Sequence, residues 1–529
     1  MSRKYLPILL LSAIVLGACS KDGTDGVDKE DNPSQDESAV VVNVVPDRSA
    51  NLRNPLCGWM LYSGLGDGLS DSFWEDYDDF QSSEGKVKVS DYANILLIRA
   101  VWSQLNPEEG VYVWQETCNT KSAQRFRYLV NGAKERGMKL AFGFSVDSRD
   151  KHENSTPDWV RLKPGIKGFS TTTGSVQVWS PYPDCPVFQA CYEQFVKDFA
   201  AQMNDHEVVD VIEGVGLGKW GEYHSCMYST GDMSPREPVF DWVCDLFMKY
   251  FTEVPVHMNY HRWIGTGKEW DGSNYDPDSE RLINKAISKG FILGSGAFGM
   301  HTYYSTWEKN FVASHRYEVP VTCEGGWVKS SHGSSIKNDG YADYAAVRRG
   351  EFDDARHACA NTMDLRYNSN LSVGETHSWF NDAFDLVKQF IADGAYRLYP
   401  DRLVLPETAS VGDEVTISHR WSNLGYAYCP TNINAWKNIY KVAFALLDPQ
   451  TEEPVAIYVD EDAHPHEWIK GRPVSYTFKT VLSDIRPGKY TWAVGIIDLE
   501  CDNKIGIRIS AKNNVAENGW LKLCDIKVQ

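Results

Sequence analysis

Two hydrophobic periods alternate along the central part of the chain. Residues 94–99 (NILLIR) form one of several short runs rich in Val, Ile and Leu, which are typical of buried strands. The stretch that Ser122 opens and Gly137 ends instead carries apolar residues at helical spacing, as an amphipathic helix does. The pattern therefore predicts strands and helices in regular alternation.

This alternation continues to about residue 394. The expected strands are residues 56–61, 94–99, 138–146, 208–212, 254–259, 291–293, 319–323 and 365–371. The expected helices include a stretch that opens at Pro186 and residues 238–251, 278–289, 306–316, 341–363 and 379–392. Eight such βα units in one run favour an α/β fold of the (β/α)8 TIM-barrel type over an open sheet.

The pattern changes after residue 396. Short runs of β-branched and aromatic residues, separated by turn residues, replace the helical spacing at residues 402–405, 414–421, 440–447, 476–478 and 489–495. This spacing is typical of an antiparallel, immunoglobulin-like β-sandwich. We therefore expect a TIM-barrel domain over residues 45–397 and a C-terminal β-sandwich domain over residues 398–529.

The first residues have the features of a targeting segment. Residues 1–4 are cationic and residues 6–16 are apolar but too short to span a bilayer, which predicts a signal peptide over residues 1–18. Residues 16–19 (LGAC) resemble the lipobox of bacterial lipoproteins, which implies a lipidated Cys19 followed by a disordered acidic tether over residues 19–44. The resemblance implies an outer-membrane lipoprotein, held by its lipid anchor only, that is exposed at the cell surface or faces the periplasm.

Composition and spacing exclude several other classes of function. The formal net charge of −19 at pH 7 argues against a nucleic-acid partner. None of the twelve cysteines is in a C-x-x-C pair, and His257 and His261 fall on an expected strand and its exit, so no metal site is expected. Residues 294–299 match G-x-G-x-x-G but open no amphipathic helix, so NAD binding is not expected.

Two glutamates stand where apolar runs break into glycine and tryptophan. Glu222 lies in residues 216–224 (GLGKWGEYH), after the fourth expected strand, and Glu324 lies in residues 319–327 (VPVTCEGGW), at the end of the seventh. In a TIM barrel the carboxyl ends of all strands meet at one face. Hydrolysis of a glycosidic bond needs two carboxyl groups, one to protonate the leaving oxygen and one to attack carbon or activate water. These positions predict a glycoside hydrolase.

The two positions resemble those of the clan A glycoside hydrolases, which are retaining TIM-barrel enzymes, and in particular their beta-galactosidase-like members. The resemblance implies that Glu324 is the nucleophile, that Glu222 is the acid/base, that no cofactor is needed, and that the partner is an oligosaccharide or polysaccharide substrate. It also implies that Arg99, after strand two, pairs with the nucleophile. A tyrosine after strand six, Tyr303 or Tyr304, is expected to hydrogen-bond the nucleophile, and Trp379, after strand eight, to stack on sugar.

Further aromatic and polar residues at expected strand ends are candidates for contact with the sugar. The substrate-binding candidates beyond Arg99, Tyr303 and Trp379 are Trp102, Trp220, His224, Asn259, His261, His301 and Trp327. Some of the tryptophans are expected to pack in the core instead.

One departure from the family pattern leaves alternatives open. Gly221 precedes Glu222 where the family usually has an asparagine, so Glu213 is the next candidate for the acid/base. A second possibility is a surface glycan-binding lipoprotein that has kept the barrel and lost catalysis. A third makes the sandwich a carbohydrate-binding module with an exposed aromatic patch of Trp421, Tyr426, Tyr428, Trp436 and Trp468.

A retaining mechanism leads to two physical expectations. Arg99 should keep Glu324 ionised, whereas partial burial should raise the pKa of Glu222 so that it can donate a proton near neutrality. The two carboxyl groups should lie about 5–5.5 Å apart, while a separation of about 6.5–9.5 Å favours inversion.

Overall fold

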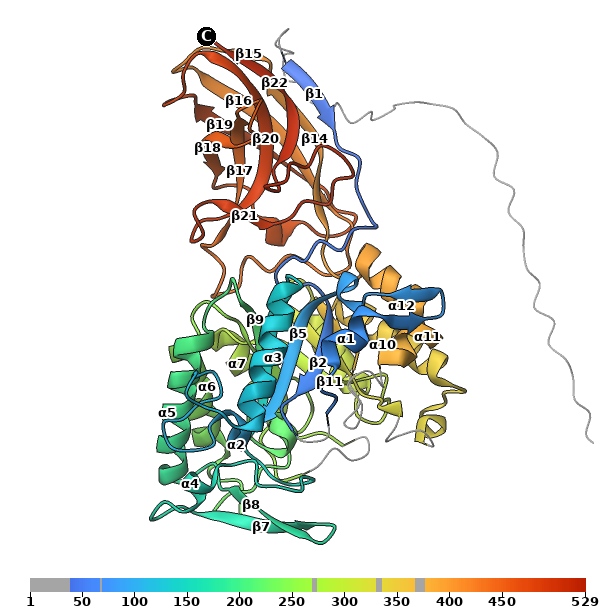
Figure 1. Ribbon diagram of the computed structural model, residues 1–529, viewed down its shortest axis with the longest axis vertical. Coiled ribbons are helices and arrows are strands. Elements are labelled where there is room, and N and C mark those ends of the chain that lie inside the picture. Colours follow the sequence, from blue (N-terminus) through green and yellow to red (C-terminus); the bar gives the residue numbers. More distant parts are fainter. Residues whose placement is uncertain (1–38, 67–68, 269–273, 330–334, 367–375) are drawn as a thin grey trace, which may run out of the picture.

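The chain forms a barrel and a sandwich stacked along the long axis of the molecule (Figure 1). The structure, a computed structural model, describes residues 39–66, 69–268, 274–329, 335–366 and 376–529. The predicted signal peptide and Cys19 lie outside these residues. In the part of the chain that is described, no helix combines the length and the apolar character that crossing a bilayer requires, and each cysteine is a free thiol.

The lower body is a closed parallel barrel, which confirms the predicted fold class. Its strands are β2 (Gly58–Gly64), β5 (Ala93–Val101), β6 (Lys139–Ser145), β9 (Val209–Glu213), β10 (Val256–Asn259), β11 (Ile292–Phe298), β12 (Val321–Gly325) and β13 (Thr362–Asp364). Neighbours along the chain pair in parallel, and β13 closes the barrel by pairing with β2. Nearly every residue of these strands is buried, because helices cover the outside and side chains fill the inside.

Helices surround the barrel. The longer ones are α3 (Lys121–Glu135), α5 (Pro186–Met203), α6 (Arg236–Tyr250), α7 (Asp278–Lys289), α8 (Thr306–Ser314), α10 (Tyr344–Ala358), α11 (Thr376–Asp382) and α12 (Phe384–Gln389), with a π-helical turn at Phe390–Gly394. Shorter ones are α1 (Phe73–Asp78), α2 (Trp102–Leu105) and α4 (Asp158–Arg161). The Thr120 side chain, not that of Ser122, caps α3 by accepting from the Ala123 amide.

The eighth strand lies earlier in the chain than its predicted position. It was expected at residues 365–371, but β13 occupies Thr362–Asp364, and residues 367–371 lie outside the described part. Helix α10 ends at Ala358 because Cys359 adopts a left-handed conformation with φ 53°. The helix expected to reach residue 363 therefore stops early, and the strand begins at once.

Two β-hairpins lie outside the barrel sheet. Strands β3 (Phe80–Ser82) and β4 (Gly85–Val87) form one of them. Strands β7 (Gly168–Thr173) and β8 (Val176–Pro181) form the other, at the end of the barrel far from the sandwich (Figure 1).

The upper body is a pair of mainly antiparallel sheets, as predicted. One sheet contains β1 (Ala39–Asn43), β14 (Leu398–Pro406), β16 (Glu414–Asn423) and β19 (Val474–Val481). The other contains β15 (Thr408–Ala409), β22 (Leu521–Val528), β20 (Gly488–Asp498), β17 (Tyr440–Leu447) and β18 (Pro454–Asp460), with β21 (Lys504–Ile507) beside β20. Aromatic side chains join the two sheets, for example Phe444 stacked on Phe478 at 5.5 Å between ring centroids.

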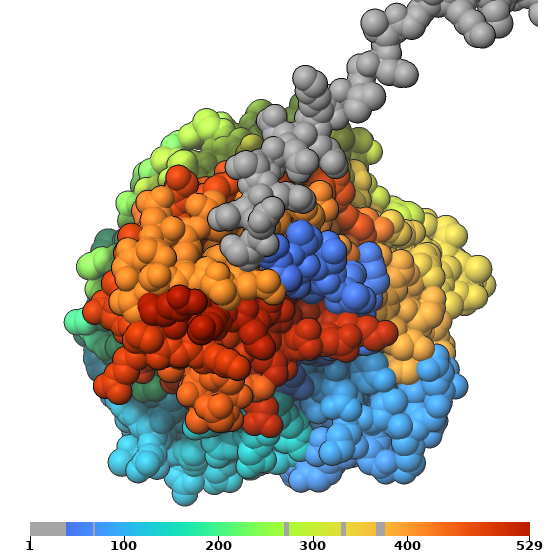
Figure 2. Space-filling view, turned by 90° about the horizontal axis from the view of Figure 1, so that it is seen from above, coloured from blue at the N-terminus to red at the C-terminus, as the bar shows by residue number. Residues whose placement is uncertain are grey.

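The predicted tether over residues 19–44 is wrong at its end. Residues 39–43 (AVVVN) form β1, which pairs antiparallel with β14 from Ala39 opposite Pro406 to Asn43 opposite Arg402. The β-branched run favours an edge strand, and Figure 2 shows the blue N-terminal segment against the orange and red surface of the sandwich. The sandwich thus contains residues from both ends of the described chain.

The sandwich packs on the amino-terminal face of the barrel. Its residues hydrogen-bond to the turns that precede barrel strands: Asn432 Nδ2 to the Glu318 carbonyl at 3.1 Å, and Trp436 Nε1 to the Glu253 carbonyl at 3.2 Å. Asn361, just before β13, donates to the Tyr428 carbonyl at 3.0 Å. The opposite face, where the carboxyl ends of the strands meet, is left clear of the sandwich.

The proposed exposed aromatic patch of the sandwich is not present. Trp421, Trp436, Trp468 and Tyr428 are buried, and Trp421 stacks on Trp468 at 4.3 Å. The half-buried Tyr426 ring is covered by the Lys470 ammonium at 3.5 Å from its centroid. These rings stabilise the core of the domain and its contact with the barrel, so they do not support a separate carbohydrate-binding surface.

Candidate active site

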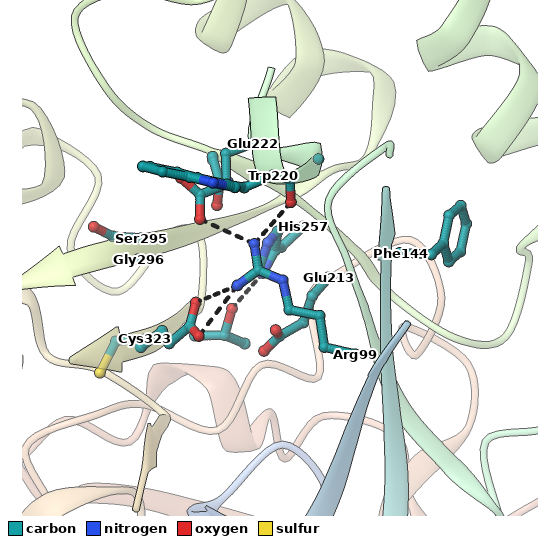
Figure 3. Close-up of a pocket in the computed structure, with 13 residues that line it drawn as sticks. Arg99, Phe144, Glu213, Trp220, Glu222, His257, Ser295, Gly296 and Cys323 are labelled. Atoms are coloured by element: carbon teal, nitrogen blue, oxygen red, sulfur yellow. Dashed lines mark hydrogen bonds and ion pairs between the residues drawn. The ribbon is translucent and has the colours of Figure 1, made fainter. Parts of the chain in front are cut away.

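A pocket of about 340 Å³ opens at the carboxyl ends of the barrel strands. In Figure 3 the Arg99 guanidinium contacts Glu222 and the Trp220 carbonyl, whereas the Phe144 ring points away from it. The lining residues are Arg99, Phe144, Glu213, Trp220, Gly221, Glu222, His257, Asn259, Ser295, Gly296, Thr322, Cys323 and Glu324. The structure thus brings together both predicted catalytic glutamates and three of the predicted substrate-binding residues, Arg99, Trp220 and Asn259.

Glu324 is held by two arginines. It lies on β12, where the strand reaches the pocket, and is buried. Arg99 Nη1, from β5, donates to both carboxylate oxygens at 3.1 and 2.9 Å, and Arg366 Nη1 forms a further ion pair with Oε1. This carboxylate therefore has a defined orientation and two positive neighbours.

Glu222 lies opposite, on the loop that follows β9. A 3₁₀ turn, Lys219–Gly221, delivers it to the pocket. Its Oε1 accepts from Arg99 Nη2 at 3.1 Å, and its Oε2 is 3.6 Å from His224 Nε2. The backbone is fixed too, because His261 Nδ1 accepts from the Trp263 amide at 3.1 Å and so leaves Nε2 to donate to the Glu222 carbonyl at 2.9 Å.

The glycine before Glu222 has a physical reason. Gly221 has φ +83°, and a Cβ at this position would lie 2.5 Å from the Phe144 carbonyl oxygen. An asparagine would therefore clash with β6 as well as adopt a disfavoured backbone conformation. Trp220 beside it also has a positive φ, 58°, so this loop holds the kind of local strain that collects at functional sites.

The separation of the two carboxylates follows from Gly296 on β11. A Cβ built on this glycine would lie 3.1 Å from Glu222 Oε1 and 3.3 Å from Glu324 Oε2. The distance between these two oxygens can be no greater than the sum of those values. That sum is an upper bound and falls just short of the range of about 6.5–9.5 Å found in inverting glycosidases, so the stereochemistry of the product has to decide between retention and inversion.

The pKa values of the pocket carboxyls differ from the expectation. Burial by itself raises the pKa of Glu222, but the hydrogen bond to His224 and the charge of Arg99 outweigh it and lower that pKa to about 2. Burial, and then the negative charge of Glu324, raise the pKa of Glu213 to about 8. The prediction that burial would raise the pKa of Glu222 is therefore wrong, and Glu213 is the carboxyl whose pKa is raised enough to hold a proton near neutrality.

Arg99 is the electrostatic centre of the pocket. Burial opposes its charge, but the neighbouring Tyr62, Glu324 and Glu222 raise its pKa well above the usual value. Its Nη2 also donates to the Trp220 carbonyl at 2.8 Å. One side chain therefore positions Glu324, Glu222 and the loop that carries Trp220.

The predicted tryptophans divide into one pocket residue and three core residues. Trp220 lines the pocket and is 38% exposed. Trp102 and Trp379 are 0% exposed: the first packs among aromatic rings of α4 and α5, and the second against Trp59 at 4.8 Å. Trp327 is buried, with Nε1 donating to the Gly299 carbonyl at 2.9 Å. The predictions that Trp102, Trp327 and Trp379 contact sugar are not supported, because barrel packing takes these rings.

The other polar residues predicted to bind substrate do not appear in the described lining of the pocket. His224 and His261 act behind Glu222, as described above. His301 is exposed and hydrogen-bonds to Tyr341 at 3.1 Å. Tyr303 does not appear in the described lining of the pocket, and the Tyr304 hydroxyl pairs with that of Tyr260 at 2.8 Å instead of with Glu324. The expected tyrosine contact with the nucleophile is therefore not made by Tyr304.

Several site residues were not predicted. Arg366, which pairs with Glu324, lies two residues after the end of β13 and was missed because the eighth strand was predicted too late in the chain. Asp364, at the end of β13, accepts from the Gly325 amide at 2.8 Å and so holds the residue next to Glu324. His257, whose Nδ1 hydrogen-bonds to Thr322 at 2.7 Å, lines the pocket but was not among the predicted substrate-binding residues.

Comparison with known proteins was made for the whole chain. No family model matches it, and no curated protein matches it. Endo-glycoceramidase II from Rhodococcus sp., in a cellobiose-like imidazole complex, is similar with a TM-score of 0.37 and 12% identity over 83% of this chain and 100% of that one. A GH30 endoxylanase from Clostridium papyrosolvens gives a TM-score of 0.36 and 10% identity over 83% and 97%. An exo-beta-1,4-mannosidase from an Opitutaceae bacterium gives 0.36 and 12% over 66% and 62%.

These TM-scores and sequence identities are too low to support an inference about this chain. Its fold and chemistry are therefore inferred from its own strand order and side chains. Those features are a closed barrel, a pocket at its carboxyl face, two oriented carboxylates and a third, protonated carboxyl.

Proposed function

We propose that this protein is a glycoside hydrolase of the clan A type that cleaves oligosaccharides or polysaccharides by a retaining mechanism. The observation that carries the proposal is the pair of buried glutamates, Glu222 and Glu324, that face one another across Arg99 at the carboxyl face of the barrel. Two carboxyl groups at short separation are what a double displacement at an anomeric carbon requires.

Glu324 is proposed as the nucleophile. Its two oxygens are aligned by Arg99, and Arg366 adds a second positive charge, so the carboxylate is oriented for attack. Attack forms a glycosyl ester and breaks the bond to the leaving oxygen, which takes a proton from a second carboxyl. That second group then removes a proton from water, which hydrolyses the ester and restores Glu324.

Two carboxyls compete for the role of proton donor. Glu222 has the place that the clan A resemblance implies, but Arg99 and His224 favour its charged form. Glu213, the last residue of β9, lines the same pocket, and its raised pKa of about 8 leaves it protonated at neutral pH. We propose Glu222 as the acid/base because of its position, and Glu213 as the alternative because it is protonated at neutral pH. The activities of the Glu222→Gln and Glu213→Gln variants distinguish the two.

The decisive experiment measures sugar release from a panel of nitrophenyl glycosides and natural oligosaccharides. It uses wild type and the Glu324→Gln, Glu222→Gln and Glu213→Gln variants, with Glu193→Gln, a half-buried residue on α5, as the matched control. β-Galactosides come first in the panel because the resemblance is to beta-galactosidase-like enzymes. Loss of several orders of magnitude in Glu324→Gln alongside an unchanged control supports the proposal, and NMR of the first-formed anomer tests retention.

The second candidate function is glycan capture without cleavage. The observation in its favour is that Arg99 binds both Glu222 and Glu324, and that Arg99 and His224 lower the pKa of Glu222, which disfavours Glu222 as a proton donor. This reading requires oligosaccharide binding by calorimetry with no release of sugar in wild type. In that case Glu222→Gln should leave the affinity nearly unchanged.

We further propose that the protein is lipidated at Cys19 and is an outer-membrane lipoprotein exposed at the cell surface, or facing the periplasm. The support is the LGAC sequence at residues 16–19 and the polar segment after it. Incorporation of labelled palmitate that is lost in Cys19→Ala tests the anchor. Digestion of intact cells with added protease tests surface exposure, because a periplasm-facing protein would be protected.

A further inference from the structure

A cluster of metal-ligand side chains joins the barrel to the sandwich, at the opposite end of the barrel from the pocket. His206 lies in the turn between α5 and β9. Asp498 is the last residue of β20 in the sandwich, and Cys501 lies in the turn that leads from it to β21. Three side chains from two chain segments and two domains therefore meet where the amino-terminal face of the barrel is covered.

The spacing of the donor atoms suits one small cation. His206 Nε2 is 2.8 Å from Asp498 Oδ2 and 3.9 Å from Cys501 Sγ, and the three ligand atoms all lie within 4.8 Å of one another. A tetrahedral zinc ion with bonds of about 2.0–2.3 Å holds its ligand atoms about 3–4 Å apart. Small side-chain movements would bring all three atoms to that distance from a common centre.

The types of donor atom indicate which metal suits the cluster. His206 offers a nitrogen, Cys501 a sulfur and Asp498 a carboxylate oxygen. Nitrogen, sulfur and carboxylate oxygen together are a donor set that suits Zn²⁺, whereas Ca²⁺ and Mg²⁺ prefer oxygen alone.

The cluster also has the supporting contacts of a metal site. His206 Nδ1, the nitrogen that faces away from Cys501, lies 3.5 Å from Glu253 Oε2. A carboxylate behind a ligating histidine fixes the ring and strengthens its binding to metal. Asp498 is oriented in turn, because its Oδ1 accepts from the Glu500 amide at 2.9 Å. His206 and Asp498 are both buried, so the site is built before any ion arrives.

We propose that His206, Asp498 and Cys501 bind one Zn²⁺ ion that joins the barrel to the sandwich. On binding, the S–H bond of Cys501 breaks, its proton passes to solvent and a sulfur–zinc bond forms, with no change of oxidation state. His206 Nε2 releases the proton of its hydrogen bond with Asp498 to solvent, and its lone pair then binds the metal with the proton of the neutral ring on Nδ1. Because none of these three residues lines the pocket, which is at the other end of the barrel, the ion stabilises the structure and takes no part in catalysis.

The test is titration of the purified, chelator-treated protein with zinc chloride alone, followed by calorimetry and by thermal unfolding. We expect one ion per chain and a rise in Tm. Cobalt(II) in place of zinc should give a near-ultraviolet thiolate-to-cobalt charge-transfer band. Cys501→Ser should abolish the band and the rise in Tm, while Cys524→Ser, a half-buried thiol on β22, should behave as wild type. Glu253→Gln should weaken zinc binding by about 10–100-fold.

The proposal is overturned if wild type binds no zinc at micromolar concentration, or if Cys501→Ser and His206→Gln bind zinc as wild type does. Should His206→Gln not fold, Cys501→Ser decides the outcome, because its half-buried side chain tolerates replacement. Hydrolysis of glycosides should be the same in zinc-free and zinc-loaded protein at a temperature where both are folded. The result is therefore independent of the proposed catalytic function.

Discussion

Arg99 donates to both carboxylate oxygens of Glu324 through a single nitrogen, Nη1, at 3.1 and 2.9 Å. Its other terminal nitrogen is thereby free to reach Glu222 Oε1 and the Trp220 carbonyl. The planar guanidinium can hold these groups at once, whereas an ammonium is a single point charge with three donors. The positions of both proposed catalytic carboxyls thus depend on one side chain of β5.

Arg99→Lys is expected to lower kcat about 100-fold, because a shift of about 1 Å in a reacting group costs that much. Arg125→Lys is the matched control. Arg125 makes three hydrogen bonds, two to the end of β2 at 2.8 and 3.1 Å and one to the loop after it at 2.8 Å, without lining the described pocket. Steady-state kinetics of both variants check the prediction, and equal losses in the two would contradict it.

Gly296→Ala is expected to lower kcat/KM about 100-fold while the protein stays folded. The added methyl would lie 3.1 Å from Glu222 Oε1 and 3.3 Å from Glu324 Oε2, in the space that a sugar must enter. Gly267→Ala serves as control, since its methyl would meet only a carbonyl oxygen at 3.5 Å. Kinetics and circular dichroism give the answer, and an unimpaired Gly296→Ala enzyme would place the reaction elsewhere.

Glu213→Gln should change how stability depends on pH. The folded pKa of Glu213, about 8, is above its unfolded value, so the folded state keeps a proton that the unfolded state releases. Wild type therefore loses stability as pH rises from about 4.3 to about 8. The variant lacks that loss and should be more stable than wild type at pH 9, by an amount on the order of a few kcal/mol, yet similar at pH 4. Urea unfolding at both pH values measures this, with Glu193→Gln as control, and parallel curves would refute it.

The pH profile of kcat/KM should identify the proton donor. Its basic limb reports the pKa of the general acid in the free enzyme. If Glu213 donates the proton, activity should persist to about pH 8 and fall above it. If Glu222 donates from the state described here, with a pKa of about 2, activity should already decline from acidic pH upward. A Glu213→Gln variant with a wild-type profile would remove Glu213 from the reaction.

Trp220→Ala and Trp379→Ala should have opposite effects. Trp220 is 38% exposed in the pocket, so its loss should raise KM and leave Tm nearly unchanged. Trp379 has no exposed surface, so its loss should destabilise the fold by about 3–5 kcal/mol. Thermal unfolding and kinetics on one preparation of each variant distinguish the two roles. A rise in KM for Trp379→Ala at unchanged Tm would restore the sugar-stacking reading.

Much of the architecture could be predicted from local patterns. The alternation of buried runs and amphipathic stretches is a property of neighbouring residues, so the closed barrel and its order of strands followed from the chain itself. The predicted bounds of a helix and a strand were wrong where a left-handed residue ended a helical pattern early. The left-handed conformation of Cys359 ends α10 before the expected residue, so the eighth strand lies earlier in the chain than predicted. For this reason Arg366 was not predicted to lie beside Glu324.

The site itself was only partly predictable. The convergence of Glu222, Glu324 and Arg99 could be predicted, because the carboxyl ends of barrel strands must meet. Their protonation could not, because a pKa depends on charges and burial supplied by several elements at once. His224 and Arg99 lower that of Glu222, while burial and Glu324 raise that of Glu213.

The sequence by itself determined the order of elements, the two-domain plan and the strand ends that carry carboxyl groups, because each depends on residues close together in the chain. Only the tertiary structure decided which tryptophans face the pocket, why Gly221 must be glycine, and that His206 meets Cys501 across the domain interface. These facts depend on contacts between residues far apart in the chain, whose distances and shared burial exist only once the barrel has closed and the sandwich has packed against it.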